Sequence, residues 1–324
     1  DESNIRTLSS IEHIRQRPGM YIGRLGNGSH PEDGIYILLK EVIDNSIDEF
    51  MEGNGSKIVV TLDGQKCSVR DYGRGIPLNK LIECVSVINT GAKYDNEAFQ
   101  YSVGLNGVGT KAVNALSSYF EITSWREGEY MHAVFERGVL KQKEKGKGEE
   151  PNGTFVSFIP DDDPAIFGKY TYNEDYIKER LWNYAYLNKG LTITFNGKTI
   201  RSPGGLMDLV KKILGDDGLY PLINYKSKNL EFSFTHTNGY GESYHSYVNG
   251  QYTSDGGTHE AAFKEGVLKG INEFFHKSWA APEIRDGIVA TVAIKVMNPV
   301  FESQTKNKLG NTDVRAWIVP EVKA

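Results

Sequence analysis

The sequence has few cysteines and no long apolar run. Its 324 residues include only two cysteines, Cys67 and Cys84. Their spacing does not fit a pair of metal ligands, and two are too few for a disulfide framework, so we interpret both as packing residues in a reducing cytoplasm. No apolar run approaches the ~18 residues of a membrane span, and Asp1 begins no signal-peptide pattern. We therefore expect a cytoplasmic protein with no membrane partner.

An excess of basic residues is also missing. The chain has 37 Lys and Arg against 42 Asp and Glu, a net charge of -5, so no overall basic field indicates nucleic-acid binding and any contact with DNA has to be local. A length of 324 residues favours two domains over one. Because the sequence opens on Asp1 and not on methionine, we expect a processed or trimmed chain.

Turn-forming residues divide the chain near position 205. The segment RSPGG at 201–205 follows an alternating strand pattern and precedes a helical pattern, so we expect one domain over 1–205 and another over 206–324. The charged segment 141–153 has no apolar period, and we interpret it as a solvated loop between two strands.

The two domains show different mixtures of patterns. In the first, alternating segments with short turns predict a largely antiparallel sheet with helices on one face, an α+β two-layer fold. In the second, the patterns predict a hairpin over 229–250, a helix over 257–277 and a strand over 287–297.

One predicted helix, over residues 33–53, carries acids within an apolar run. At about 100° per residue, Asn45, Asp48 and Asp44 fall at about 40°, 340° and 300° from Glu41, so the four share one stripe. Apolar residues occupy most of the remaining circumference, which predicts a helix enclosed by protein. The stripe suits a general base, Glu41, beside an oxygen ligand for magnesium, Asn45. It also suits a solvated face with ordinary salt bridges, and the helix alone does not decide between them.

Two glycine-containing loops follow this helix. In RDYGRGIP at 70–77, Asp71 ends a strand and can accept a hydrogen bond from an exocyclic amine, although the same pattern is common in plain turns. In SVGLNGVGTKAVNALSSYF at 102–120, glycines lead into an amphipathic helix, an arrangement that binds anions through backbone N–H groups. Neither a dinucleotide fingerprint nor a Walker A loop fits, because no strand pattern precedes GVGTKA and the lysine and threonine of GLNGVGTK are in the wrong order.

Together, ExxDNxxDE from Glu41, DxGxGIP from Asp71 and GLxGVGxxxVNALS from Gly104 resemble the GHKL ATPase superfamily. With RPGMYIG at 17–23, GGTHEAAF at 256–263 and QTKNKLGN at 304–311, essentially the whole chain resembles the B subunits of bacterial type II DNA topoisomerases. NTGAKYD and VGLNGVGTK are more similar to topoisomerase IV members than to gyrase members. The resemblance implies a GHKL (Bergerat) two-layer α/β sandwich, the ATPase domain, and then a ribosomal-S5-like α+β transducer domain that is truncated at its carboxyl end.

The resemblance also implies ATP and Mg²⁺ as cofactors and assigns residue roles. Glu41 would be the general base, Asn45 the magnesium ligand and Asp71 the acceptor for the adenine amino group. The other residues expected to contact ATP are Gly75, Ile76, Lys93, Gly104, Leu105, Asn106, Gly107, Val108, Gly109, Thr110 and Thr154, with Gln304 and Lys306 reaching the γ-phosphate from the second domain. The implied inhibitor pocket consists of Asp48, Glu49, Arg74, Pro77 and Arg126.

Several partners follow from the same resemblance. ATP binding would close a homodimer over double-stranded DNA, and cleavage would need an A subunit that binds through carboxyl-terminal regions absent from this sequence. The amino-terminal arm that wraps the partner protomer in the family is also missing before RPGMYIG, so we expect only a weak homodimer.

Three positions depart from the family pattern, and one rival function stays open. Phe99, Asn106 and Ile37 stand where family members carry a tyrosine, a lid histidine and a histidine before the general base, which concerns the positioning of ATP rather than the reaction class. The rival is a GHKL clamp or chaperone-like module in which ATP orders a dimer. The QTKNKLGN segment after GGTHEAAF favours the topoisomerase.

Overall fold

The computed structural model describes residues 9–86, 108–303 and 306–324. The chain divides into two compact units. The first contains Asp1–Trp182 and Gly190–Arg201, and the second contains Asn183–Lys189 and Ser202–Ala324. The expected assignment of an ATPase domain to 1–205 and a transducer domain to 206–324 stays a prediction.

An eight-stranded sheet and the helices that pack on it make up the first unit. The strands are β1 (Lys57–Asp63), β2 (Lys66–Asp71), β3 (Ser117–Arg126), β4 (Glu129–Glu136), β5 (Val139–Lys147), β6 (Gly153–Pro160), β7 (Thr192–Phe195) and β8 (Lys198–Ile200). The helices are α1 (Ser10–Gln16), α2 (Gly19–Ile22), α3 (Gly34–Met51), the short 3-10 turn η2 (Leu78–Lys80), α4 (Leu81–Ser86), α5 (Gly109–Ala115) and α6 (Glu174–Leu187), whose last turn belongs to the second unit.

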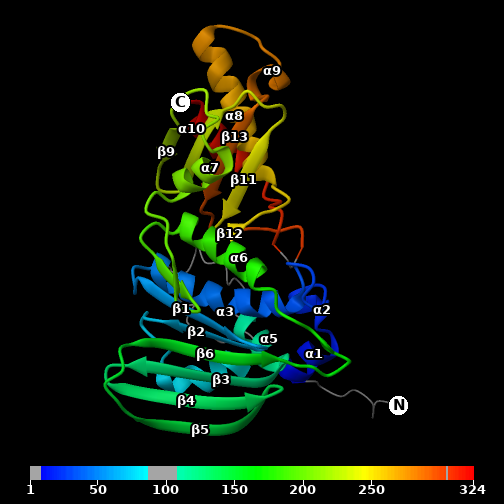
Figure 1. Cartoon of the computed structure of the whole chain (residues 1–324), viewed down its shortest axis with the longest axis vertical. Helices are drawn as coiled ribbons and strands as arrows, with labels where there is room; N and C mark the ends of the chain where they lie inside the picture. Colours follow the sequence, from blue (N-terminus) through cyan, green and yellow to red (C-terminus); the bar gives the residue numbers. More distant parts are fainter. Residues whose placement is uncertain (1–8, 87–107, 304–305) are drawn as a thin grey trace. The chain divides into compact units, whose positions relative to one another are not determined.

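The strand order is β5-β4-β3-β6-β2-β1-β7-β8. Of the described pairings in this sheet, only that of β1 with β7 is parallel. Figure 1 shows α1, α3 and α5 on one face of the sheet. The prediction of a largely antiparallel sheet with helices on one face is therefore confirmed.

Helix α3 is enclosed on nearly all sides. Ile35, Leu38, Ile43 and Ile47 are fully buried, and each contributes roughly 1.5–3 kcal/mol by leaving water. Three acids of the stripe are buried as well, Glu41 at 8%, Asp44 at 2% and Asp48 at 2% exposure, whereas Asn45 is half-buried. The interpretation of this stripe as a fully solvated face is therefore wrong, because most of its carboxylates are buried.

The charged segment 141–153 is not a loop throughout, which corrects our expectation. Residues up to Lys147 belong to β5, the edge strand of the sheet, which pairs with β4. Residues 141–145 are all exposed, Gln142 and Glu144 on one face as well as the lysines on the other, so neither face of this part of the strand needs apolar residues and no alternating pattern marks it in the sequence.

The second unit is a five-stranded sheet with helices. Its strands are β9 (Ile223–Lys226), β10 (Leu230–His236), β11 (Ser243–Val248), β12 (Gln251–Tyr252) and β13 (Ile288–Ile294), in the order β12-β11-β13-β10-β9. Its helices are α7 (Leu206–Leu214), α8 (Thr258–Phe275), α9 (Ala281–Arg285) and α10 (Arg315–Lys323). The helix predicted over 257–277 and the strand over 287–297 are confirmed as α8 and β13.

The hairpin predicted over 229–250 is wrong. Both of its strands exist, but β13 lies between them, antiparallel to β10 and parallel to β11. Ile288, Val292 and Ile294 of β13 are at most 2% exposed and share a core with Phe263 of α8. Because β13 is the most apolar strand of the sheet, its central place buries more apolar surface than a direct β10–β11 pairing would.

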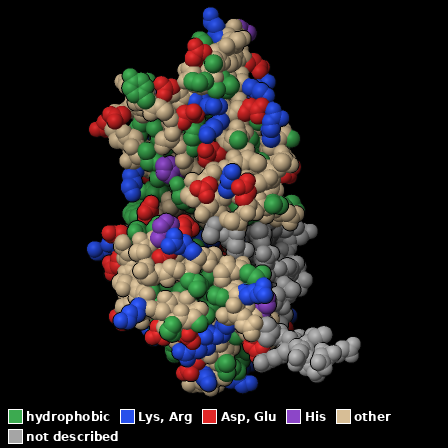
Figure 2. Space-filling model, turned by 90° about the vertical axis from the view of Figure 1, so that its right-hand side faces the viewer, with side chains coloured by type: hydrophobic (Ala, Val, Ile, Leu, Met, Phe, Trp, Pro, Cys, Tyr) green, Lys and Arg blue, Asp and Glu red, His purple; other side chains and the backbone are tan. Residues whose placement is uncertain are grey.

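The fold class is α+β in both units, as predicted. Over the face in Figure 2, acidic and basic side chains are intermixed, in agreement with the small net charge of -5. Within the described part of the chain, no helix has the length and apolar character needed to cross a membrane.

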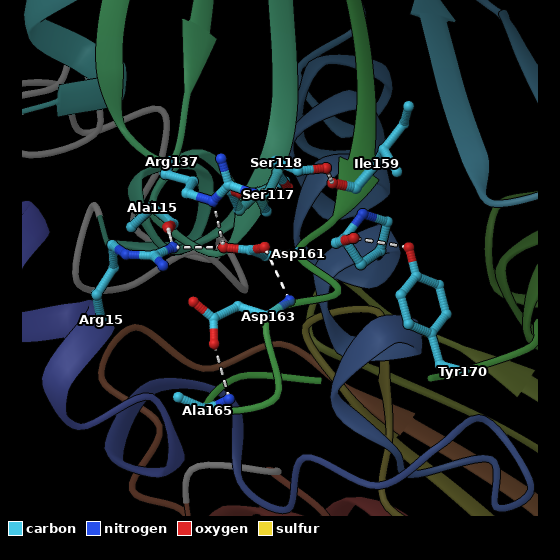
Figure 3. Close-up of polar contacts among 12 residues, drawn as sticks. Arg15, Ala115, Ser117, Ser118, Arg137, Ile159, Asp161, Asp163, Ala165 and Tyr170 are labelled. Carbon is cyan, nitrogen blue, oxygen red and sulfur yellow. Dashed lines mark hydrogen bonds and ion pairs between the residues drawn. The ribbon is translucent and has the colours of Figure 1, made fainter. Parts of the chain in front are cut away.

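A buried carboxylate ties several segments of the first unit together. Asp161, which follows β6 and is fully buried, lies 2.9 Å from Nη1 of Arg15 and 3.1 Å from Nε of Arg137. Arg15 also donates to the carbonyl oxygen of Ala115 (2.8 Å) at the end of α5 (Figure 3). The arrangement joins α1, α5 and the β4–β5 turn through one charge.

We expect Asp161→Asn to destabilise the first unit by about 3 kcal/mol, since two guanidinium groups then lose their buried anion. The urea dependence of the fluorescence of the chain measures this change. Asp163→Asn is the matched control, because Asp163 accepts a side-chain hydrogen bond only from the backbone of Ala165 among the described residues. Equal effects of the two substitutions would contradict the interpretation.

The second unit contains a buried neutral histidine at the start of α8. His259 is fully buried, its Nε2 lies 3.1 Å from Oγ1 of Thr253, and burial lowers its pKa to about 3. In the unfolded chain the pKa is near 6.5. Between these two values the unfolded state binds the extra proton, so this contribution to stability is complete above pH 6.5 and is lost as pH falls toward 3.

Acidification from pH 7.5 to pH 5 should therefore lower the urea midpoint of the second unit, and His259→Asn should show a smaller decrease. Urea titrations of both proteins at both pH values, followed by hydrogen exchange in α8, measure the difference. An identical pH dependence in the two proteins would show that other groups cause it.

Candidate functional site

The predicted general base lies against the start of α5. Glu41 is 8% exposed, and a Cβ on Gly109 would be 2.2 Å from its Oε2. A side chain at position 109 would therefore displace the Glu41 carboxylate from this place against the helix. Asn45, one turn later on α3, donates from Nδ2 to the hydroxyl of Thr110 (2.7 Å) and to the carbonyl of Glu41 (3.1 Å). The first turn of α5 is thus placed beside both predicted residues, and Val108 precedes it.

The predicted adenine acceptor, Asp71, is a buried carboxylate surrounded by donors. It ends β2 and is 4% exposed. Its Oδ1 accepts from the backbone N–H groups of Gly73 (3.0 Å) and Thr154 (3.3 Å). Its Oδ2 accepts from the hydroxyls of Thr154 (2.5 Å) and Ser46 (2.9 Å). These four donors hold the carboxylate in one orientation, with the negative charge compensated by hydrogen bonds.

The loop after Asp71 is held by the end of β3. Ser124 accepts a hydrogen bond from the N–H of Ile76 (2.8 Å) and donates one to its carbonyl (2.7 Å). Gly75 has φ +78°, and a Cβ there would be 2.6 Å from the carbonyl oxygen of Trp125. Glycine is therefore required for the conformation and for the close approach.

The residues expected in the inhibitor pocket gather around this loop. Glu49 accepts from Nε (3.2 Å) and Nη2 (3.0 Å) of Arg74, and this hydrogen-bonded contact raises the pKa of Arg74. Arg126 lies against Gly75, where an added Cβ would be 2.9 Å from its Cγ. Asp48, the residue before Glu49 on α3, is buried, and Pro77 immediately precedes η2.

A buried ion pair of two residues one turn apart lies within α3. Lys40 and Asp44 are 3% and 2% exposed, and their Nζ and Oδ2 atoms are 3.1 Å apart. A buried charge without a partner would cost several kcal/mol, so the lysine compensates Asp44 next to Glu41. Asp44 therefore supports the helix rather than contributing a ligand.

Sequence reasoning missed two hydroxyl groups of the site. Ser46 lies about 140° from Glu41 on the helical wheel, outside the acidic stripe, and so the stripe does not include it. Ser124 lies near the end of β3, with no motif around it. The adjacency of Ser46 to Asn45 was the only local signal, and tertiary contact with Asp71 was needed to interpret it.

The remaining predicted residues belong to the second unit, to the core around α3 or to segments outside the described residues. Lys306 belongs to the second unit, has φ +59° and donates its backbone N–H to the carbonyl of Ser303 (3.0 Å). Lys93, Gly104, Leu105, Asn106, Gly107 and Gln304, as well as the variant position Phe99, lie outside the described residues. Ile37 is 5% exposed, within the core around α3.

Two family models match the chain. The model described as histidine kinase-, DNA gyrase B-, and HSP90-like ATPase matches residues 30–164, and the model for DNA gyrase B matches residues 186–323. The first range contains Glu41, Asn45, Asp71 and Thr154, and the second contains Lys306.

Comparisons over the whole of this chain agree with these family models. The chain is 56% identical to the B subunit of DNA topoisomerase 4 from Borreliella burgdorferi, and this match covers 100% of the chain and 54% of the relative. It is 34% identical to the B subunit of DNA gyrase from Helicobacter pylori, and this match covers 97% of the chain and 44% of the relative. It thus spans about half the length of these relatives. Among solved structures it is similar to the 43K ATPase domain of Thermus thermophilus gyrase B in complex with an aminocoumarin, with 30% identity, a TM-score of 0.75, and coverage of 98% of this chain and 89% of that one.

Proposed function

Since this chain belongs to the family of type II DNA topoisomerase B subunits and corresponds to their ATPase region, we propose that it binds ATP beside Asp71 and hydrolyses it with Glu41. One observation carries this proposal. Consecutive residues of α3 contact both ends of the site, because Asn45 bonds Thr110 near Glu41 and Ser46 bonds Asp71. A single rigid helix therefore sets the distance between the base-binding end and the reacting end.

At the base-binding end, Asp71 accepts the amino group of adenine. Its donors hold the carboxylate in one orientation, so binding loses little entropy in ordering it. Thr154 bonds the same carboxylate and, with Gly75 and Ile76, borders the pocket. An amino group is a donor, whereas the keto group of guanine at that position is an acceptor, and this difference favours ATP over GTP.

At the reacting end, Glu41 removes a proton from the attacking water, and Asn45 contributes an oxygen ligand. Magnesium, when bound, neutralises charge on the phosphates. An amide oxygen together with phosphate oxygens matches the oxygen ligands that this ion prefers. The turn from Val108 to Thr110 would cover the phosphates with its backbone N–H groups, together with Gly104, Leu105, Asn106 and Gly107 and with Lys93 nearby.

The second unit would complete the site through Gln304 and Lys306, which we propose bind the γ-phosphate. A cation that loses its phosphate partner after hydrolysis can release its own unit, and this links the reaction to movement. The positive φ of Lys306 holds its segment in a turn. The match of the gyrase B model over 186–323 supports this role over that of a clamp or chaperone-like module.

For the longer protein we propose ATP-driven passage of double-stranded DNA, with a homodimer of B subunits, an A subunit as partner and a cytoplasmic location. Similarity to the Borreliella burgdorferi protein at 56% identity, against 34% for the Helicobacter pylori gyrase protein, favours topoisomerase IV over gyrase. An aminocoumarin is a suitable inhibitor, bound by Asp71 with Asp48, Glu49, Arg74, Pro77 and Arg126, since the Thermus thermophilus structure holds such a compound.

Glu41→Ala should reduce ATP hydrolysis by about 10²–10⁴-fold while leaving nucleotide affinity within a small factor, because the general base acts only in the reaction. Steady-state turnover and calorimetric binding of a non-hydrolysable analogue measure the two effects. Glu52→Gln, at the carboxyl end of the same helix, is the control and should retain turnover. Full turnover by Glu41→Ala would remove the general-base assignment.

Asp71→Asn should lower ATP affinity at least about tenfold and reduce the preference for ATP over GTP. The substitution removes the negative charge, and the amide can present a donor NH2 group to the adenine amino group in place of an acceptor oxygen. Competition calorimetry with ATP, GTP and an aminocoumarin measures this, and the aminocoumarin should weaken in parallel. Asp63→Asn, at the end of the neighbouring strand β1, is the control. Unchanged discrimination between ATP and GTP would contradict the role of Asp71.

A further inference from the structure

The guanidinium group of Arg70 lies between two aromatic rings beside the proposed base-binding pocket. Its Cζ is 4.2 Å from the ring centroid of Tyr72 and 4.3 Å from that of Trp125. Arg70 is 8% exposed. Because successive residues of a strand point to opposite faces, its side chain leaves β2 on the face opposite to that of Asp71.

The same guanidinium donates to two backbone carbonyls. Nη1 donates to the carbonyl of Asp71, and Nη2 donates to the carbonyl of Pro151 (2.7 Å), with Oε1 of Glu150 at 3.3 Å. The end of β2 is therefore joined to the loop that enters β6. Stacking keeps the guanidinium plane fixed, and its fork of N–H groups lets one side chain reach both carbonyls.

A glycine makes this approach possible. Gly153, the first residue of β6, has φ +142°, and a Cβ there would lie 2.3 Å from Nη1 of Arg70 and 2.1 Å from the carbonyl oxygen of Asp71. The next residue, Thr154, bonds the Asp71 carboxylate through both its N–H and its hydroxyl. Arg70 thus fixes the backbone of Asp71 and the segment that carries its strongest donor.

Asp71 is consequently held from both faces of the sheet. Its carboxylate is bonded by Ser46, Gly73 and Thr154 on one side, and its carbonyl is bonded by Arg70 on the other. Rotation of the peptide after Asp71 would break the Arg70 bond and turn the carboxylate. The orientation of the acceptor therefore depends on a side chain that does not touch the nucleotide.

We propose that Arg70 is a positioning residue for base recognition, which sets the direction in which Asp71 accepts the amino group of the purine. The inference rests on the proposed function, because it assumes that Asp71 binds adenine. It adds the stack of Tyr72, Arg70 and Trp125 as the support on which the choice between ATP and GTP depends. Lysine cannot replace arginine here, since one ammonium group cannot stack as a plane and reach both carbonyls.

The test compares Arg70→Lys and Arg70→Gln with the wild type for the Kd and KM of ATP, the kcat of hydrolysis and the ratio of GTP to ATP affinity. We expect Kd and KM to rise about tenfold, the preference for ATP to fall by a similar factor, and kcat to stay within about twofold. Lys57→Gln is the matched control, because Nζ of Lys57 also lies over the Tyr72 ring, at 5.9 Å, on a different strand.

A double-mutant cycle separates positioning from plain stability. In an Asp71→Asn background, Arg70→Gln should cause no further loss of ATP affinity, because both changes act on one interaction. Additive losses, or a lower melting temperature with unchanged Kd and discrimination, would overturn the proposal. If Arg70→Gln does not fold, Trp125→Leu removes one face of the stack, and an unchanged KM for ATP in that variant would overturn it equally. A wild-type chain that binds no ATP would instead refute the proposed function.

Discussion

A buried carboxylate must be surrounded by donors, and Asp71 obtains its donors from three separate segments of the first unit. Ser46 comes from α3, Gly73 from the loop after β2 and Thr154 from the start of β6. An unsatisfied ion at 4% exposure would cost several kcal/mol, so the helix and two neighbouring strands can pack only in the arrangement that delivers these groups. The geometry proposed to recognise a purine is thus the same geometry that stabilises the fold.

Helix α3 transmits that constraint to the other end of the site. It is buried on its apolar faces and on its acidic stripe, and the Lys40–Asp44 pair compensates one of its charges internally. Rotation of the helix would expose its isoleucines to water or separate buried charges from their partners. Glu41 and Asn45 therefore keep their positions against Gly109 and Thr110. Rigidity here has a chemical use, since a general base is effective only within hydrogen-bond reach of its water.

Glycines mark the places where backbone and charged groups approach most closely. Gly109 admits the Glu41 carboxylate, Gly75 admits the end of β3, and Gly153 admits both Arg70 and the Asp71 carbonyl. In each case a methyl group would overlap an atom well inside normal contact distance, so the loops are shaped by what they approach and not by flexibility. The short range of these contacts also explains why motif spacing in the sequence is so restrictive.

Motifs and periodicity were sufficient to identify the acidic helix, the glycine loop after Asp71, most strands and the α+β class, because these follow from local propensity and from side-chain patterns within one element. They were insufficient wherever the outcome depended on a distant segment. The alternating segment 229–250 indicated both strands but not their separation by β13, and the lysine-rich edge strand carried no pattern at all. Ser46, Ser124 and Arg70 have no motif of their own, since their importance comes from contacts with residues 25, 48 and 81 positions away, which only folding brings together. Residue chemistry can be read along the chain, whereas the direction in which a buried group is held is a property of everything packed around it.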